Sequence, residues 1–304
     1  MLIARSQNRR PKRTDAEIAG VLDCVSAEKL RWYVEMLAFP RHYVAERSAN
    51  IRARDLLLKL LRNFGYEPVL QGSYDNIVVT SSENEEGPYI LLGAHYDSVP
   101  GSPGADDNGS AVAVCLECAR LAKEHGIGGA MIVLFNREED GLMGSHEFVA
   151  HAASQPAWTI EEAHVFEMVG YCSRVAGSQR MPPGMPLVGA PDVGDFLGLL
   201  SNRHSNGIAE NLLALAATYL PHSPVLALKV YFGIEKYFGH LLRSDHSPFW
   251  EAGIPSIMWT DTSEFRNPHY HRASDTPDTL DFTFLAQVAK LALARVVSRG
   301  SRGR

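Results

Sequence analysis

The stretch YILLGAHYDSVPGSPGADDNGSAVAV, from Tyr89 to Val114, begins with an apolar run that ends on a histidine. A continuous apolar run of this length is typical of a strand that is covered on both faces of its sheet. The polar loop that follows leads into a helical pattern over Gly109–His125. Strand, loop and helix in this order predict one step of a parallel α/β sheet.

The same alternation extends along the chain in both directions. The segments that read as strands are Pro68–Gln71, Asn76–Ser81, Ala130–Asn136, Ala163–Val169, Val225–Val230 and Pro255–Thr260. The segments with helical periodicity are Ser26–Phe39, Glu46–Phe64, Ser145–Ala152 and Phe282–Arg299. Because crossovers between parallel strands are right-handed, we expect a single three-layer α/β domain. Its central sheet should be mixed but mostly parallel, with helices on both faces.

The composition indicates the domain boundaries. Residues 1–14 and 300–304 are basic, and we expect both to be disordered tails, with polyanion binding as the alternative. Residues 15–299 then form a single catalytic α/β domain that is large enough to bury a substantial core. Within this domain we expect an irregular insertion at about 170–222, which is rich in Gly and Pro toward its start.

The overall charge and the cysteines indicate the setting of the protein. A formal net charge of −6 argues against nucleic acid or an anionic membrane as a partner. No apolar run approaches the roughly 18 residues of a membrane span, and no secretory signal precedes the first charges. Cys115 and Cys118 lie in a helical segment, which favours free thiols over a redox or zinc pair. We therefore expect a cytoplasmic protein.

Side chains that can bind a metal follow the ends of four predicted strands. They are His95 with Asp97, Glu138 with Glu139, Glu167, and His269 with His271. In open α/β sheets such strand ends meet at one edge. Zinc takes imidazole nitrogen and carboxylate oxygen, and a two-zinc site also needs a bridging carboxylate and a separate base. Five ligands could come from His95, Asp107, Glu139, Glu167 and His271, which leaves Glu138 as the base.

Several of these residues also have a simpler interpretation. Asp106 and Asp107 could cap a helix, and Glu138 and Glu139 could be a solvated loop pair. The Gly-rich loop lacks the Gly-Lys-Ser/Thr signature of a phosphate cradle. The run RSDHSPFW holds Ser, Asp and His side by side, but no nucleophile elbow accompanies it. The coincidence of four strand ends is what favours a metal site.

Five segments together resemble a known family. They are GAHYDSVPGSPGADDNGS, NREEDGLMGS, FEMVGY, SDHSPFWEAGIPSIM and NPHYHRASDTPDTLD, in this order between Tyr89 and Asp281. The sequence resembles the zinc exopeptidase family that contains the bacterial leucyl-type aminopeptidases, glutamate carboxypeptidase and glutaminyl cyclase. Within that family it resembles a less characterised bacterial branch. The resemblance implies two Zn²⁺ ions as cofactors, or one if the protein is a cyclase.

The resemblance also implies roles around the first metal. His95 matches a ligand of that metal, and Asp97 matches the acid that orients the histidine. Asp107 matches the bridging carboxylate, and its peptide bond to Asn108 is expected to be cis. Glu167 stands where the family often has Asp, as the other ligand of the first metal.

The remaining matches concern the second metal and the reaction. Glu139 and His271 match ligands of the second metal, and Glu138 matches the general base. The implied reaction is hydrolysis of a terminal peptide bond by a metal-activated hydroxide. The expected substrate is a peptide or an amino-acid amide, cut most directly by aminopeptidase action.

Three further residues could contact the substrate. Met168 and Tyr270 adjoin proposed ligands and could form pocket walls, with core packing as the alternative, and Tyr270 could also stabilise the oxyanion. Arg266 could hold a substrate carboxylate, which would favour carboxypeptidase or dipeptidase action, or it could form a salt bridge. Two competing hypotheses for the whole chain are glutaminyl cyclase activity and a non-catalytic binding protein on the same fold.

Overall fold

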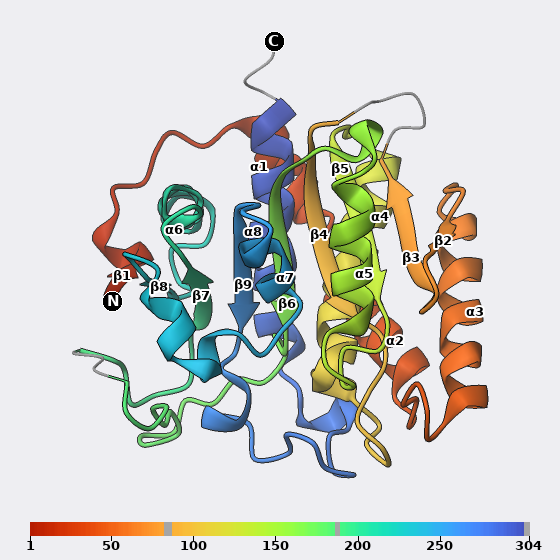
Figure 1. The fold of residues 1–304 in the computed structure, drawn as a ribbon. Helices are drawn as coiled ribbons and strands as arrows, with labels where there is room; N and C mark the ends of the chain where they lie inside the picture. The colour runs from red at the N-terminus through yellow and green to blue at the C-terminus, as the bar shows by residue number, and fades with distance from the viewer. Residues whose placement is uncertain (82–86, 186–188, 301–304) are drawn as a thin grey trace.

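One sheet organises the described residues, which are 1–81, 87–185 and 189–300 of the computed structural model (Figure 1). Its strands are β1 (Leu2–Arg5), β2 (Val69–Gln71), β3 (Asn76–Thr80), β4 (Tyr89–His95), β5 (Ala130–Phe135), β6 (Ile160–Glu167), β7 (Leu197–Ser201), β8 (Val225–Lys229) and β9 (Ser256–Thr260). Their order across the sheet is β1-β8-β7-β9-β6-β4-β5-β3-β2. The prediction of an α/β fold with a mixed central sheet is therefore confirmed.

The centre of the sheet is parallel, and both flanks contain antiparallel pairs. β4 pairs in parallel with β5 and β6, and β6 pairs in parallel with β9. In this register His95 lies beside Phe135, and Glu167 lies beside Thr260, so these strands end at the same edge. Every residue of β4 and β5 is buried, as their continuous apolar sequences predict.

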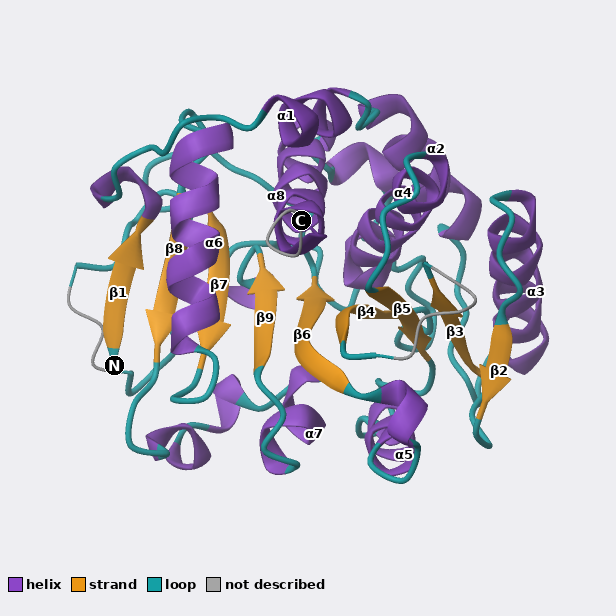
Figure 2. Cartoon of the chain, turned by 90° about the horizontal axis from the view of Figure 1, so that it is seen from above, coloured by secondary structure: helices purple, strands orange, loops and turns teal. Residues whose placement is uncertain are grey.

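The helices form unequal layers on the two faces of the sheet (Figure 2). One face carries α1 (Ala16–Asp23), α2 (Ala27–Leu37), α3 (Arg47–Asn63), α4 (Ala111–Glu124), α6 (Asn206–Tyr219) and α8 (Phe282–Gly300). The other face carries α5 (Met143–Ala152) and α7 (His246–Glu251). α4 is buried along most of its length because it packs against β4, α2 and α8. The larger apolar core therefore lies on the α4 side.

The N-terminal segment differs from the disordered tail expected over residues 1–14. Leu2–Arg5 pairs antiparallel with β8 and forms an edge of the sheet. The chain then runs over α6, where Arg9 forms an ion pair of 2.7 Å with Glu210. The prediction was wrong for this segment because its partners lie more than 200 residues away in the sequence.

The region at about 170–222 is irregular only in its first part. Residues 171–185 and 189–196 form no helix or strand, but β7 and α6 follow them. β7 pairs with both β8 and β9, so it joins two parts of the sheet. The expected irregular insertion is therefore corrected for residues 197–219. Of the expected C-terminal tail, Gly300 ends α8, and 301–304 lie outside the described residues.

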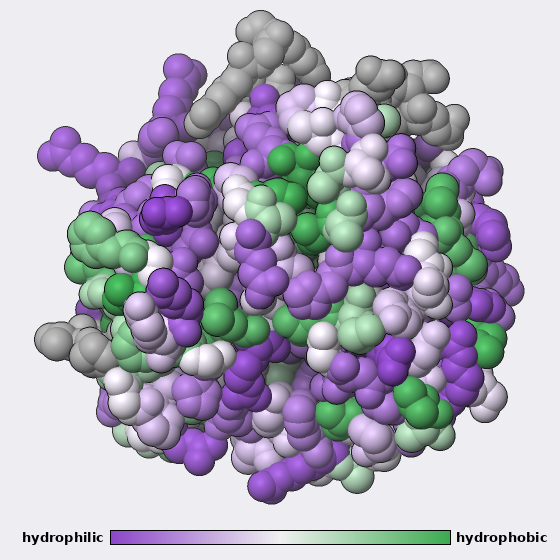
Figure 3. All heavy atoms as spheres, in the orientation of Figure 1, coloured by the Kyte–Doolittle hydropathy of each residue, from purple (hydrophilic) through white to green (hydrophobic). Residues whose placement is uncertain are grey.

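The surface and the cysteines complete the description. Within the described ranges, no helix combines the length and the apolar character that crossing a bilayer requires. The face shown in Figure 3 carries hydrophobic side chains as separate patches among hydrophilic ones. Cys115 and Cys118 are buried free thiols in α4, as their helical context predicts.

Replacement of Ser6 tests whether the N-terminal segment belongs to the folded domain. Ser6 is buried, and its Oγ accepts a hydrogen bond of 3.1 Å from the backbone N–H of Val225. Ser6→Ala leaves that buried N–H without this partner, so we expect the free energy of unfolding to fall by about 1–2 kcal/mol. Chemical denaturation measures the change, with the exposed Asn8→Ala as the control. Equal stability of Ser6→Ala and the wild type would contradict the docking of this segment.

Candidate metal centre

Strand ends and loops bring together the six residues assigned above to the ligands and the base. His95 and Glu167 are the last residues of β4 and β6. The others lie in connecting segments: Asp107 in the turn Ala105–Ser110 before α4, Glu138 and Glu139 after β5, and His271 after β9. These residues meet at the edge of the sheet where the parallel strands end.

Asp107 lies between the two imidazoles. Its Oδ1 is 3.4 Å from Nε2 of His95, and its Oδ2 is 3.2 Å from Nε2 of His271. One buried carboxylate therefore offers one oxygen to each of two positions. This is the arrangement that a ligand shared by two metal ions requires.

The other carboxylates divide between these two positions. On one side, Oε2 of Glu167 lies 3.5 Å from Nε2 of His95. On the other side, Oε2 of Glu139 lies 3.6 Å from Nε2 of His271. The potential ligand atoms of His95, Asp107 and Glu167 lie within 4.8 Å of one another, and we call these residues the first set. The same holds for Asp107, Glu139 and His271, which form the second set.

Glu138 borders both sets. Its Oε2 is 3.9 Å from Nε2 of His95. It also forms a third compact group with His95 and Glu139, which belong to different sets. Glu138 is therefore placed to reach a molecule held between the two positions.

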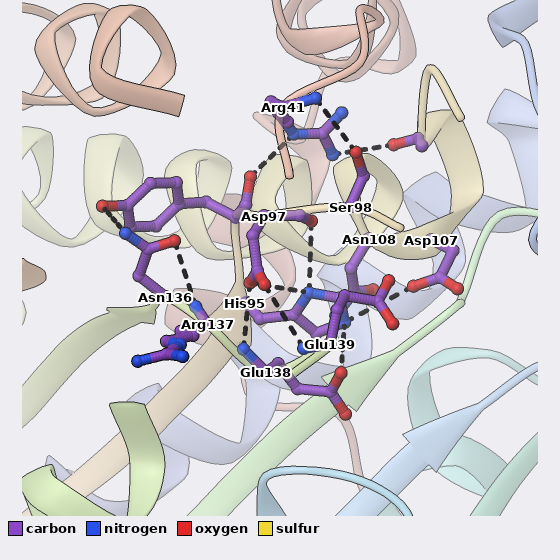
Figure 4. Close-up of polar contacts among 12 residues, drawn as sticks. Arg41, His95, Asp97, Ser98, Asp107, Asn108, Asn136, Arg137, Glu138 and Glu139 are labelled. Atoms are coloured by element: carbon purple, nitrogen blue, oxygen red, sulfur yellow. Dashed lines mark hydrogen bonds and ion pairs between the residues drawn. The ribbon is translucent and has the colours of Figure 1, made fainter. Parts of the chain in front are cut away.

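Asp97 holds the loop that carries the two glutamates (Figure 4). Its carboxylate oxygens accept the backbone N–H of Glu138 at 3.2 Å and that of Glu139 at 3.3 Å. Its Oδ1 also lies 3.5 Å from Nδ1 of His95. One buried carboxylate thus positions the imidazole and both glutamates, which agrees with an orienting role and extends it.

Asp275 fixes the backbone at the bridging residue. Its two carboxylate oxygens accept the N–H of Asp106 at 2.9 Å and the N–H of Asp107 at 3.0 Å. The peptide bond from Asp107 to Asn108 is cis, as the resemblance implies. Sequence reasoning gave Asp275 no role, although it lies in the same short motif as His271.

The side chain of Asn108 links the bridging segment to the end of β6. Its amide donates to the carbonyl of Phe166 at 2.9 Å, and its oxygen accepts the N–H of Met168 at 3.0 Å. Because these two residues flank Glu167, one side chain holds the bridge and this carboxylate in register. Met168 is fully buried and does not line the cavity described below, so the expectation that it forms a pocket wall is not met.

Arg41 is a buried cation that the sequence analysis missed. Its guanidinium donates to the backbone carbonyls of Tyr96 at 2.7 Å, Leu37 at 2.8 Å and Gly104 at 2.9 Å. Burial lowers the pKa of Arg41 to about 10, against the opposing effect of nearby acids such as Asp275, so it stays charged at neutral pH. Arg41 thus clamps both ends of the loop between β4 and the turn before α4 (Figure 4).

The crowding of acids shifts their ionisation. Burial and neighbouring carboxylates raise the pKa of Glu138 and of Glu139 well above the ordinary value. Burial opposes ionisation of Asp107 too, but the favourable interactions of its carboxylate with His271 and His95 outweigh burial and lower its pKa. Burial also acts to lower the pKa of His95, yet the carboxylates led by Glu138 and Glu167 raise it well above its ordinary value. Bound cations would relieve this excess of negative charge.

The donor set fits zinc. Imidazole nitrogens and carboxylate oxygens are ligands that Zn²⁺ takes in proteins. Nε2 of His95 and Oε1 of Glu139 are buried and have no hydrogen-bond partner in the described part of the chain. A buried polar atom without a partner is costly, and coordination of a metal ion would satisfy both atoms.

A cavity of about 480 Å³ opens at the cluster, and Tyr270 lines it beside the metal-binding residues. The Tyr270 ring stacks on His271 with 3.7 Å between the ring centroids. Its hydroxyl accepts a hydrogen bond of 2.7 Å from Arg243, which in turn forms an ion pair with Glu264. Tyr270 therefore lies where the sequence analysis placed it, with a partner that was not foreseen.

Arg266 does not line the cavity, contrary to the expectation that it could hold a substrate carboxylate. It is buried, its Nε donates to the side chain of Gln179 at 3.0 Å, and its guanidinium lies over the ring of Phe196. These contacts support the irregular segment after β6. Arg266 therefore gives no support to carboxypeptidase action.

Ser244 is a further residue that the sequence analysis did not assign to this site. Its Oγ donates a hydrogen bond of 2.8 Å to Oε2 of Glu167. Ser244 belongs to RSDHSPFW, the run in which Ser, Asp and His lie side by side. The structure gives this serine a supporting contact to a carboxylate of the centre.

Comparison with known proteins identifies the family. Residues 76–191 and 202–296 match Peptidase family M28. The chain belongs to peptidase family M28. It is 35% identical over 235 residues to "Uncharacterized protein YfbL" of Escherichia coli strain K12, a match that covers 73% of this chain and 70% of YfbL.

Solved structures of other proteins share this fold. BSAP, a zinc aminopeptidase from Bacillus subtilis, is 28% identical with a TM-score of 0.56, and the match covers 74% of this chain and 50% of BSAP. This chain thus spans about half the length of that enzyme. LapA of Legionella pneumophila has a TM-score of 0.75 at 20% identity, over 96% of this chain and 78% of LapA. The family is therefore one of zinc metallopeptidases, and the recognition from sequence motifs is confirmed.

Replacement of Arg41 by lysine tests the clamp. Lysine keeps the positive charge but lacks the planar fork of donors, so it cannot reach all the carbonyls that Arg41 bonds. We expect Arg41→Lys to lower the free energy of unfolding by about 3 kcal/mol and the zinc affinity by about tenfold or more. Denaturation and zinc titration measure the two effects, with the exposed Arg52→Lys as the control. Unchanged zinc affinity in Arg41→Lys would show that the clamp does not shape the centre.

Proposed function

We propose that the chain is a two-zinc exopeptidase that hydrolyses a terminal peptide bond, most directly as an aminopeptidase. The observation that carries the proposal is the Asp107 carboxylate, whose oxygens lie 3.4 Å from His95 and 3.2 Å from His271. A shared carboxylate with separate ligands on each side supports two zinc positions rather than one. His95 and Glu167 would hold one ion, and Glu139 and His271 the other.

Glu138 is the general base of the proposed reaction. The bound zinc pair would supply Lewis-acid activation of a water molecule and of the scissile carbonyl. Glu138 accepts the proton of the water and passes it to the leaving amine. Burial raises the pKa of Glu138, which favours proton uptake, and Asp97 holds its backbone in place.

In the proposed reaction, Tyr270 stabilises the carbonyl oxygen of the substrate as negative charge develops on it. The Tyr270 hydroxyl accepts a hydrogen bond from Arg243, so its own proton can be donated toward the cavity. Stacking on His271 fixes the direction of the ring. A donor that is fixed before the reaction needs no reorganisation during it.

The substrate and the setting complete the proposal. We expect a peptide or an amino-acid amide as the substrate, because the cavity that opens at the centre has room for an organic group. The cytoplasmic location inferred from the sequence stays a prediction. The four cysteines, all free, support a reducing compartment.

The matched pair Glu138→Gln and Glu139→Gln tests the roles of the two adjacent glutamates. Glu138→Gln removes the base, so we expect kcat for leucine amide to fall by about 10²–10⁴-fold while two zinc ions per chain are retained. Glu139→Gln removes a ligand, so we expect the zinc content to fall together with the activity. Steady-state kinetics and metal analysis measure these quantities.

Four results would contradict this assignment. Full activity in Glu138→Gln would exclude Glu138 as the base, and loss of a zinc ion in that variant would make it a ligand. In the wild type, one tightly bound zinc ion together with cyclisation of N-terminal glutamine would indicate a glutaminyl cyclase. Bound zinc without turnover of any amide would indicate a binding protein.

A further inference from the structure

The cavity extends from the metal centre across a part of the sheet that α5 does not cover. On the face that carries α5 and α7, these helices pack over β4, β5 and β6, and α7 also contacts the beginning of β9 (Figure 2). Beyond β6, the cavity lies directly on β9, β7, β8 and β1. Its opposite wall includes Met185, Leu241 and Leu242, which belong to the small apolar cluster on this face.

The floor of this cavity consists of two rows of side chains that run across the strands. The first row continues the line of Glu167 through Thr260, Gly198 and Leu226. The second row is Met258, Leu200, Leu228 and Ile3. Neighbouring strands lie about 4.8 Å apart, so Leu226 is roughly 14 Å and Ile3 roughly 19 Å from the strand that carries Glu167. We call this floor and the space above it the trough.

Gly198 has no side chain, so it leaves space in the cavity at the middle of the first row. A Cβ at this position would lie 3.1 Å from the carbonyl oxygen of Thr260 and within 3.7 Å of the methyl groups of Thr260 and Thr262. Past Leu226 the row reaches Arg5, whose guanidinium donates a hydrogen bond to the carbonyl of Gly189. The trough therefore begins at the metal-binding residues and has a defined far end.

The shape and chemistry of the trough favour an alkyl chain over a peptide. An extended peptide that crosses the strands would bury one N–H and one C=O per residue. The strands of the floor already bond to one another, so their backbone offers few partners to such a peptide. A single leucine or phenylalanine side chain would span little more than one strand spacing of about 4.8 Å. An unbranched alkyl chain needs no polar partner and can follow the whole row.

We propose that the trough binds an unbranched acyl chain, and that the site hydrolyses the amide that joins such a chain to an amino acid. The inference rests on the proposed function for its hydrolytic chemistry, and it names a substrate class for the same site. The acyl chain lies over Thr260, Gly198 and Leu226, which places its carbonyl carbon at the end next to Glu167. The amino-acid part then lies on the other side of the metal-binding residues, near Arg243 and Tyr270, which also line the cavity.

The reaction balances with water as the only co-reactant. The water oxygen forms a bond to the carbonyl carbon, and the bond from that carbon to nitrogen breaks. Glu138 carries one water proton to the leaving nitrogen. The products are a fatty acid and a free amino acid, which at neutral pH are present as carboxylate and ammonium.

Binding to the Glu138→Gln variant tests the trough without turnover. The probes are butanoyl-leucine, octanoyl-leucine and dodecanoyl-leucine, with calorimetry as the measurement. Each buried methylene is worth up to about fourfold in affinity, so we expect octanoyl-leucine to bind at least tenfold more tightly than butanoyl-leucine. In the wild type, we expect release of leucine from octanoyl-leucine to be faster than from butanoyl-leucine at equal low concentration.

Bulky residues along the first row test its direction. We expect Leu226→Trp to weaken dodecanoyl-leucine by at least tenfold and to leave butanoyl-leucine unchanged. Gly198→Val, one strand closer to the centre, should also weaken octanoyl-leucine. Leu2→Trp is the matched control, because Leu2 lies on the neighbouring strand β1 but is 53% exposed and does not line the cavity. A cut-off in chain length that moves with position cannot arise from general loss of structure.

The outcomes separate the trough from the proposed hydrolase. Equal binding of all three probes, or equal losses for all three in Leu226→Trp, would overturn the trough even if leucine amide is hydrolysed. Length-dependent binding of oligo-leucine peptides without such binding of acyl chains would assign the trough to a peptide and overturn the proposal. Length-dependent binding of the acyl probes without hydrolysis of any amide would support the trough and overturn the hydrolase.

Discussion

The carboxylate of Asp107 must face two imidazoles at once, and much of the surrounding structure holds it in that position. Its oxygens lie 3.4 Å from His95 and 3.2 Å from His271, although these histidines are far apart in the sequence. Asp275 binds the backbone N–H of Asp107, and Arg41 clamps the loop before it. Because these partners come from separate segments, the centre forms only when the edge of the sheet is assembled.

The positive charge of the buried Arg41 partly offsets the negative charge of the acidic residues at the metal centre. Arg41 is fully buried and interacts electrostatically with Asp275, Asp97, Asp107 and Glu139. Its hydrogen bonds go to carbonyl groups, so the acids keep their oxygens for other partners. The unpartnered atoms of His95 and Glu139 face the same space. Because Arg41 bonds to carbonyl groups and not to the carboxylates, the site remains negatively charged, and two cations would neutralise that charge.

The sequence predicts best what depends on local pattern. The apolar runs of β4 and β5 predict buried strands, and the residues that follow these strands include His95, Glu138 and Glu139. Arg41 and Asp275 could not be found this way, because their roles arise from hydrogen bonds to backbone groups distant in the sequence. β1 was missed for the same reason, since it has only four residues and pairs with a strand near residue 229.

The two missed parts of the sheet also shape the cavity. β1 and β7 extend the sheet beyond its parallel centre, and the face that they add supports the cavity rather than a helix. The irregular segment after β6 and the turn before α7 close this space from the other side. The metal-binding edge follows from the parallel strands, whereas the form of the cavity follows from segments with weak local signals. The sequence alone therefore allows the metal-dependent chemistry to be predicted, but not the shape of the cavity that determines substrate specificity.

Anomalous diffraction at the zinc absorption edge, from crystals grown with zinc, tests the central claim most directly. We predict two peaks about 3.5–4 Å apart, one next to Nε2 of His95 and one next to Nε2 of His271, with the carboxylate of Asp107 between them. A single peak, or peaks that Asp107 does not join, would contradict the shared carboxylate and with it the two-zinc centre.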